Sequence, residues 1–161
     1  MATTILGISP GTRNIGIAVI ENNELLEWQV INFKHRCNIK KLHIIVRTIE
    51  SLCEHFNVTS VGMKQPVLFR SSKDLKNLTY FMERMLKKNK LLYAKYTLTE
   101  LKVHSCKTGR QTKSELMECI VEKYPILRKL YLKERNNQRP YYQKMFEAIA
   151  AANLYEKEKN S

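Results

Sequence analysis

Short apolar runs separated by polar turns open the chain. The runs at residues 3–8, 15–20 and 25–33 have the length and composition of β-strands. The polar residues 21–24 between the second and third runs favour a hairpin. The first 33 residues therefore predict three consecutive strands.

Further along the chain, apolar residues recur every three to four positions, the spacing of a helix with one buried face. Asn38 can cap the first such helix, and a second runs from about residue 75 to residue 90. Short apolar runs at 60–63 and 91–96 predict two more strands. Thr97 and Thr112 each stand three residues before a glutamate, as in a capping box, and each predicts the start of a helix.

A last helix is expected from near Pro140 to about Tyr155, because proline is tolerated in a first helical turn. The resulting order is β-β-β-α-β-α-β-α-α. It predicts an α/β fold with a mixed five-stranded sheet flanked by helices.

With 161 residues and 43% hydrophobic residues, the chain is long enough and apolar enough to form one folded domain over residues 1–161. No apolar run reaches membrane-spanning length, and no signal segment opens the chain. We expect an intracellular protein without a membrane partner, in the cytoplasm or with the nucleoid. The four cysteines form no Cys-x-x-Cys pair, which favours reduced, buried thiols over a disulfide or a zinc site.

The charge is strongly unbalanced, with 28 Lys and Arg residues against 15 Asp and Glu residues and a formal net charge of +13. Such a positive field favours polyanions, of which nucleic acid is the usual one. A generic basic surface is the other interpretation. Asp74 is the single aspartate, so any cluster of carboxylates that binds Mg²⁺ must be built almost wholly from glutamate.

Four sequence blocks resemble those of the RuvC family of Holliday-junction resolvases, which have an RNase H-like fold. They are Ile-Leu-Gly-Ile-Ser-Pro-Gly-Thr-Arg at residues 5–13, Val-Gly-Met-Lys-Gln at 61–65, Lys-Thr-Gly-Arg-Gln-Thr-Lys at 107–113 and Glu-Ala-Ile-Ala-Ala-Ala at 147–152. Each block alone is weak evidence, and four in order cover nearly the whole chain. The resemblance implies a magnesium-dependent nuclease of DNA recombination and repair that acts as a homodimer.

The four catalytic acids of the family fall on Ser9, Lys64, Lys144 and Glu147. A neutral serine, two lysines and one glutamate give a formal charge of +1 in place of −4. Hydrolysis with two metal ions needs several carboxylates to hold the ions, and two ammonium groups would repel Mg²⁺. We therefore expect a catalytically inactive protein with no metal cofactor.

The two lysines have three possible roles. An ammonium group can occupy the position of a metal and pair with Glu147, or it can contact the phosphate that a metal would have contacted. The third possibility is that Lys64 and Lys144 are ordinary exposed lysines.

Contacts with nucleic acid are expected from the loops around this site, as the resemblance implies. The candidates are aromatic and basic: Arg13, Phe69, Arg70, Lys107, Arg110 and Lys113. Phe69 can stack on a base or anchor a loop in the core, and Val67 is the position that an ungapped comparison with the family gives. The basic residues near Gly109 can grip phosphate beside a helix N-terminus or remain solvated.

The sequence thus favours an inactive RuvC-like protein that binds branched or structured nucleic acid without metal-dependent cleavage. Two alternatives are an active junction endonuclease with an atypical metal site and a protein-interaction module that keeps only the fold and a dimer surface. A sugar kinase of the actin-like class shares the opening strand-turn-strand, but it needs a duplicated domain that 161 residues cannot supply.

Overall fold

The computed structural model describes residues 3–11, 13–32, 38–67, 72–106 and 112–161. Five strands form one mixed sheet in the order β3-β2-β1-β4-β5. The three strands β1 (Thr4–Ser9), β2 (Asn14–Glu21) and β3 (Glu24–Asn32) form an antiparallel meander. Strand β4 (Ser60–Lys64) runs parallel to β1, and β5 (Leu92–Tyr96) runs parallel to β4. The predicted α/β class with a mixed five-stranded sheet is confirmed.

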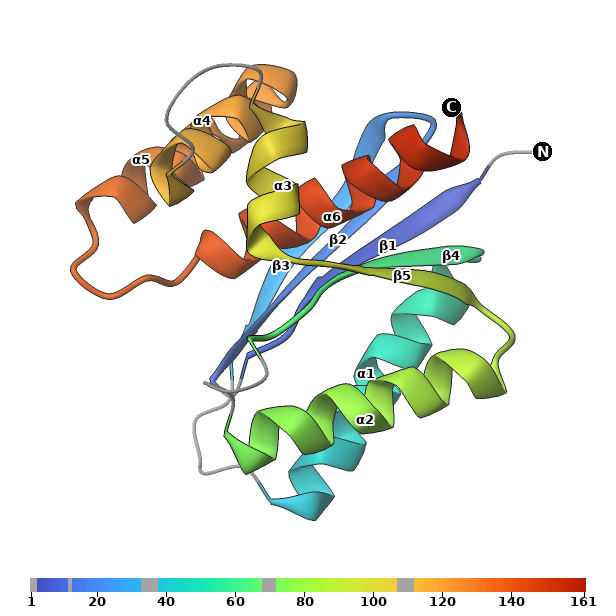
Figure 1. Ribbon diagram of the computed structural model, residues 1–161. Helices are drawn as coiled ribbons and strands as arrows, with labels where there is room; N and C mark the ends of the chain where they lie inside the picture. Colours follow the sequence, from blue (N-terminus) through green and yellow to red (C-terminus); the bar gives the residue numbers. More distant parts are fainter. Residues whose placement is uncertain (1–2, 12, 33–37, 68–71, 107–111) are drawn as a thin grey trace.

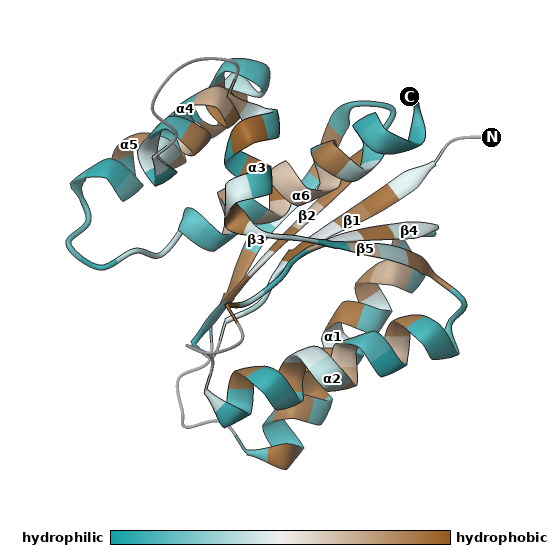
Figure 2. Ribbon diagram, in the orientation of Figure 1, coloured by the Kyte–Doolittle hydropathy of each residue, from teal (hydrophilic) through white to brown (hydrophobic). Residues whose placement is uncertain are grey.

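Helices cover both faces of the sheet (Figure 1). One face carries α1 (Ile39–His55) and α2 (Lys73–Lys88). The other carries α3 (Leu98–Ser105), α4 (Lys113–Lys123), α5 (Arg128–Asn136) and α6 (Gln143–Lys159), with a 3-10 turn at Pro125–Leu127. Both α1 and α2 turn apolar residues to the sheet and polar residues outward (Figure 2), which gives each face its own hydrophobic core.

Local sequence signals explain several element boundaries. Asn22 and Asn23 both have positive φ angles, the conformation of a two-residue type I′ turn between β2 and β3. The side chain of Asn38 accepts a hydrogen bond from the backbone N–H of Lys41 at 2.9 Å and so caps α1. Thr112 and Glu115 form the full reciprocal capping box at the start of α4.

Helix α6 lies directly on the sheet because three glycines face it. A Cβ atom at Gly7, Gly16 or Gly62 would collide with the backbone of α6. These glycines belong to β1, β2 and β4, so the helix crosses the three adjacent strands. Their missing side chains set the distance between the helix and the sheet.

The structure corrects three predictions. Four helices follow β5, where the expected order had two. The helices that start after Thr97 and Thr112 and the last helix are all present, and α5 adds a fourth because it is too polar to show a clear apolar repeat. Helix α6 begins at Gln143 and ends at Lys159, later than expected at both ends. Cys106 and Cys119 form a disulfide because the end of α3 lies beside α4, which the sequence could not show. Cys53 remains a free, buried thiol whose pKa burial raises to about 12.

Candidate functional site

Two strand ends and one helix meet at one edge of the sheet. Because β1 and β4 are parallel, with Ile8 opposite Met63, the following residues Ser9 and Lys64 lie at the same edge. Helix α6 crosses above them and carries Lys144 and Glu147, three residues apart and therefore on one face.

The ammonium group of Lys64 pairs with the carboxylate of Glu147. Its Nζ lies 2.9 Å from Oε2 and donates a hydrogen bond to Oε1 at 3.4 Å. The side chains are 14% and 2% exposed, respectively, so water screens the pair little. In a buried pair, each charge compensates the desolvation cost of the other. Lys64 thus engages both oxygens of the glutamate.

Lys144 lies beside this pair and makes no hydrogen bond or ion pair with any described residue. Burial lowers the pKa of its ammonium group. The carboxylate of Glu147 opposes this shift, whereas the positive charges of Lys64 and Lys113 add to it. Lys144 therefore carries a partly desolvated positive charge that forms no ion pair with a described carboxylate.

A pocket of about 110 Å³ joins these groups. Among the described lining residues, the charged ones are Lys64, Lys113, Lys144 and Glu147, which together carry a formal charge of +2. The structure thus brings three of the four predicted acid positions together. Asn14, Pro140, Tyr141 and Gln143 complete the lining.

Ser9 lies next to this pocket but does not line it. Its residue is fully buried, opposite Gly16 in the β1–β2 pairing, and Gly16 lies under the backbone of Lys144. The Ser9 hydroxyl has no hydrogen-bond partner among the described residues, and neither has the side-chain oxygen of Asn14. A single hydroxyl is a poorer ligand for a metal ion than the carboxylate to which the resemblance assigns this position.

The predicted nucleic-acid contacts are described only in part. Arg13 is exposed just before β2, and Lys113 is exposed at the first residue of α4, where it also lines the pocket. Phe69, Arg70, Lys107 and Arg110 lie outside the described residues.

Glu134 fixes the start of α6, a role that the sequence did not predict. This buried carboxylate on α5 accepts hydrogen bonds from the backbone N–H groups of Tyr141 and Gln143 at 2.9–3.0 Å. Tyr142, the N-cap residue, provides no side-chain cap, so Glu134 satisfies free donors at this helix end. The signal is not local, since Glu134 lies nine residues before Gln143.

The side chains at this site do not fit a pair of divalent ions. Mg²⁺ is bound by several oxygen ligands, and Glu147 is the one carboxylate among the described residues that line the pocket. Across the described part of the chain, no group of three or more His, Cys, Asp or Glu residues could hold a metal ion. The described helices also include none long and apolar enough to cross a membrane.

Comparison with solved structures identifies the class of fold. RuvC from Thermus thermophilus matches with a TM-score of 0.72 at 14% identity, covering 98% of this chain and 97% of that one. The T. thermophilus RuvC in complex with a Holliday junction substrate matches at 0.70 and 14% identity, over 97% and 96% of the two chains. The Fowlpox virus resolvase in complex with its substrate Holliday junction DNA matches at 0.65 and 12% identity, over 99% and 100%. The fold is therefore RNase H-like.

The sequence identifies the family within this class. The family model of the crossover junction endodeoxyribonuclease RuvC matches residues 5–115. No curated protein sequence matches the chain. The chain belongs to the RuvC family, as the four sequence blocks predicted.

Proposed function

We propose that this protein binds branched nucleic acid of the Holliday-junction type and does not cleave it by the metal-dependent mechanism of its family. The observation that carries the proposal is the buried ion pair between Lys64 and Glu147. Its ammonium group occupies the carboxylate oxygens that a metal ion would need. Membership of the RuvC family and the net charge of +13 support a nucleic-acid partner.

The positive groups beside the ion pair provide the binding chemistry. Lys64 is neutralised by Glu147, whereas Lys113 and Lys144 line the same pocket without a carboxylate of their own. Ammonium groups in this arrangement attract backbone phosphates and release counterions on binding. We further propose that the protein acts as a homodimer, because two copies would present two such sites to a four-way junction.

A labelled four-way junction tests this proposal directly, with a linear duplex of the same arm sequences as control. We expect tight binding to the junction with a steep loss of affinity as salt increases, and no cleavage with Mg²⁺ or Mn²⁺. Paired cuts at fixed positions would establish instead an active endonuclease with an atypical metal site. Equal, weak binding to both DNAs would favour a protein-interaction module.

A further inference from the structure

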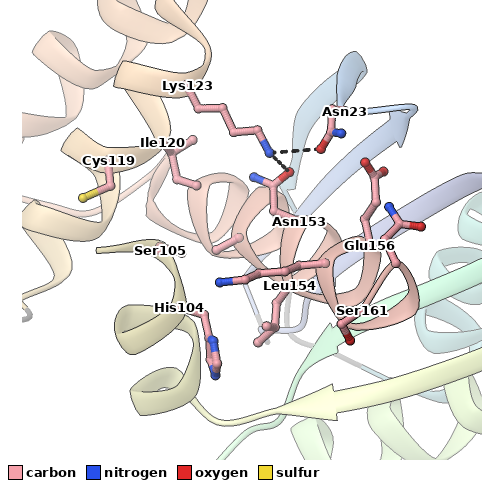
Figure 3. Close-up of a pocket in the computed structure, with 13 residues that line it drawn as sticks. Asn23, His104, Ser105, Cys119, Ile120, Lys123, Asn153, Leu154, Glu156 and Ser161 are labelled. Carbon is pink, nitrogen blue, oxygen red and sulfur yellow. Dashed lines mark hydrogen bonds between the residues drawn. The ribbon is translucent and has the colours of Figure 1, made fainter. Parts of the chain in front are cut away.

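A second and larger pocket lies toward the other end of α6 (Figure 3). Its volume is about 570 Å³, and it is bounded by the β2–β3 turn, the end of α3, helix α4 and the last turns of α6. It shares no described lining residue with the pocket at Lys64. Its volume is typical of sites that bind small molecules.

Glu156 projects from α6 as a buried carboxylate that lines this pocket. The residue is only 7% exposed, and both carboxylate oxygens are buried without a hydrogen-bond partner in the described structure. It forms no ion pair with any described cation either. A buried charge without a partner is strongly unfavourable, so this carboxylate is a binding group that lacks its counterpart.

Lys123 lines the same pocket from α4. Its Nζ donates hydrogen bonds to the side-chain oxygens of Asn153 at 3.1 Å and Asn23 at 3.4 Å (Figure 3). Desolvation lowers the pKa of Lys123, and the negative charge of Glu156 opposes that shift. The two charges therefore influence each other without forming an ion pair. An ammonium group has three donors, so one donor of Lys123 remains for a ligand.

We propose that this pocket binds a small zwitterion of the amino-acid class. The ammonium or guanidinium group of the ligand pairs with Glu156, and its carboxylate pairs with Lys123. A ligand with one charge would satisfy only one of these groups and leave the other unchanged. Because the oxygens of Glu156 are covered, its side chain rotates toward the ligand on binding.

Titration with ω-amino acids of increasing length tests this pairing and measures the separation of the two charges. The probes are glycine, 4-aminobutanoate and 6-aminohexanoate, together with L-arginine, and the controls are butylamine and butanoate, each with one charge. By calorimetry or NMR, we expect at least one zwitterion to saturate the protein and to bind about tenfold more tightly than either control, equivalent to one good ionic contact.

Matched variants assign each end of the ligand. E156Q should abolish the preference for the zwitterion over butanoate, and K123M should abolish its preference over butylamine. K129M removes an exposed lysine on α5 outside the pocket and should leave the affinity unchanged. Equal binding of zwitterions and singly charged controls, or no saturable binding at millimolar concentrations, would overturn the proposal.

Stability provides a second readout that needs no ligand. Since E156Q removes a buried charge without a partner, it should raise the thermal midpoint of the free protein by about 2–4 °C. A lower midpoint would show that Glu156 already has a partner in the protein, and would contradict the proposal.

Discussion

Two buried glutamates of α6 differ in whether their carboxylates have a partner. Glu147 is 2% exposed and pairs with Lys64, whereas Glu156 is 7% exposed and its carboxylate has neither a hydrogen bond nor an ion pair with a described residue. They lie nine residues apart on α6, so the same helix provides a carboxylate to each of two pockets.

One carboxylate is thus neutralised by an ion pair, and the other has no partner among the described residues. At Glu147, a lysine of the protein itself takes the place that a metal would need, and the surplus positive charge on Lys113 and Lys144 is available for an anion. At Glu156, the nearby cation is Lys123, which forms no ion pair with the carboxylate. We therefore propose phosphate as the ligand of the first site, and for the second a ligand that carries its own cation.

The largest expected effect follows from removing the partner of Glu147. K64M leaves a buried carboxylate unpaired and should lower the free energy of unfolding by about 3–5 kcal/mol, measured by urea denaturation. The double variant K64M/E147L replaces the pair with apolar groups and should recover most of this loss.

A more exposed ion pair in the same protein is the control for this measurement. Lys95 lies 3.1 Å from Glu83, with side chains that are 37% and 22% exposed. Because water screens this pair, K95M should cost at most about 1 kcal/mol. Equal losses in the free energy of unfolding for K64M and K95M would mean that burial does not strengthen the Lys64–Glu147 pair.

The next effect concerns metal affinity at the Glu147 site. The triple variant S9D/K64E/K144D restores acids at the four positions that match the family and removes both ammonium groups. It should bind Mn²⁺ measurably by calorimetry, while the wild-type protein and the neutral variant S9N/K64Q/K144N should not. Absence of metal uptake in the triple variant would refute the assignment of these positions.

The smallest effect concerns the pH dependence of junction binding. Burial lowers the pKa of Lys144 from its usual value of 10.5, so this lysine loses its proton at a lower pH than an ordinary lysine. As pH rises through that lowered pKa, one phosphate contact weakens, and the affinity should fall by about tenfold at most. Between the lowered pKa and 10.5 the unfolded chain binds more protons, so stability should increase over the same range.

Arginine substitution isolates Lys144 as the cause. K144R keeps its positive charge throughout the range, so its junction affinity should vary less with pH than that of the wild-type protein. K159R changes an exposed lysine at the far end of α6 and serves as the control. A K144R profile that matches the wild-type profile would exclude a contribution of Lys144 to the pH dependence.

The sequence predicted the parts of the fold that depend on residues close together in the chain. Strand runs, the turn at Asn22 and Asn23 and the caps at Asn38 and Thr112 depend on neighbouring residues, and the structure has each of them. The three-residue spacing of Lys144 and Glu147 also predicts that both lie on one helix face, and both line the same pocket.

Features that join distant segments could not be predicted from spacing. Periodicity does not indicate that Glu134 holds the start of α6, that Cys106 meets Cys119, or that Asn14 enters the pocket. The second pocket could not be predicted either, because Glu156 and Lys123 come from different helices and no sequence motif links them.

The glycines beneath α6 support a helix that lines both pockets. Gly16, Gly7 and Gly62 lie under the backbone at Lys144, Ala148 and Ala151, so they support the first half of a helix that continues well beyond them. A helix is nearly a rigid rod, and a methyl group added at Gly16 would act as a wedge under one end. Such a substitution would tilt α6 and displace its C-terminal end. A change beneath the first pocket would therefore move residues that line the second.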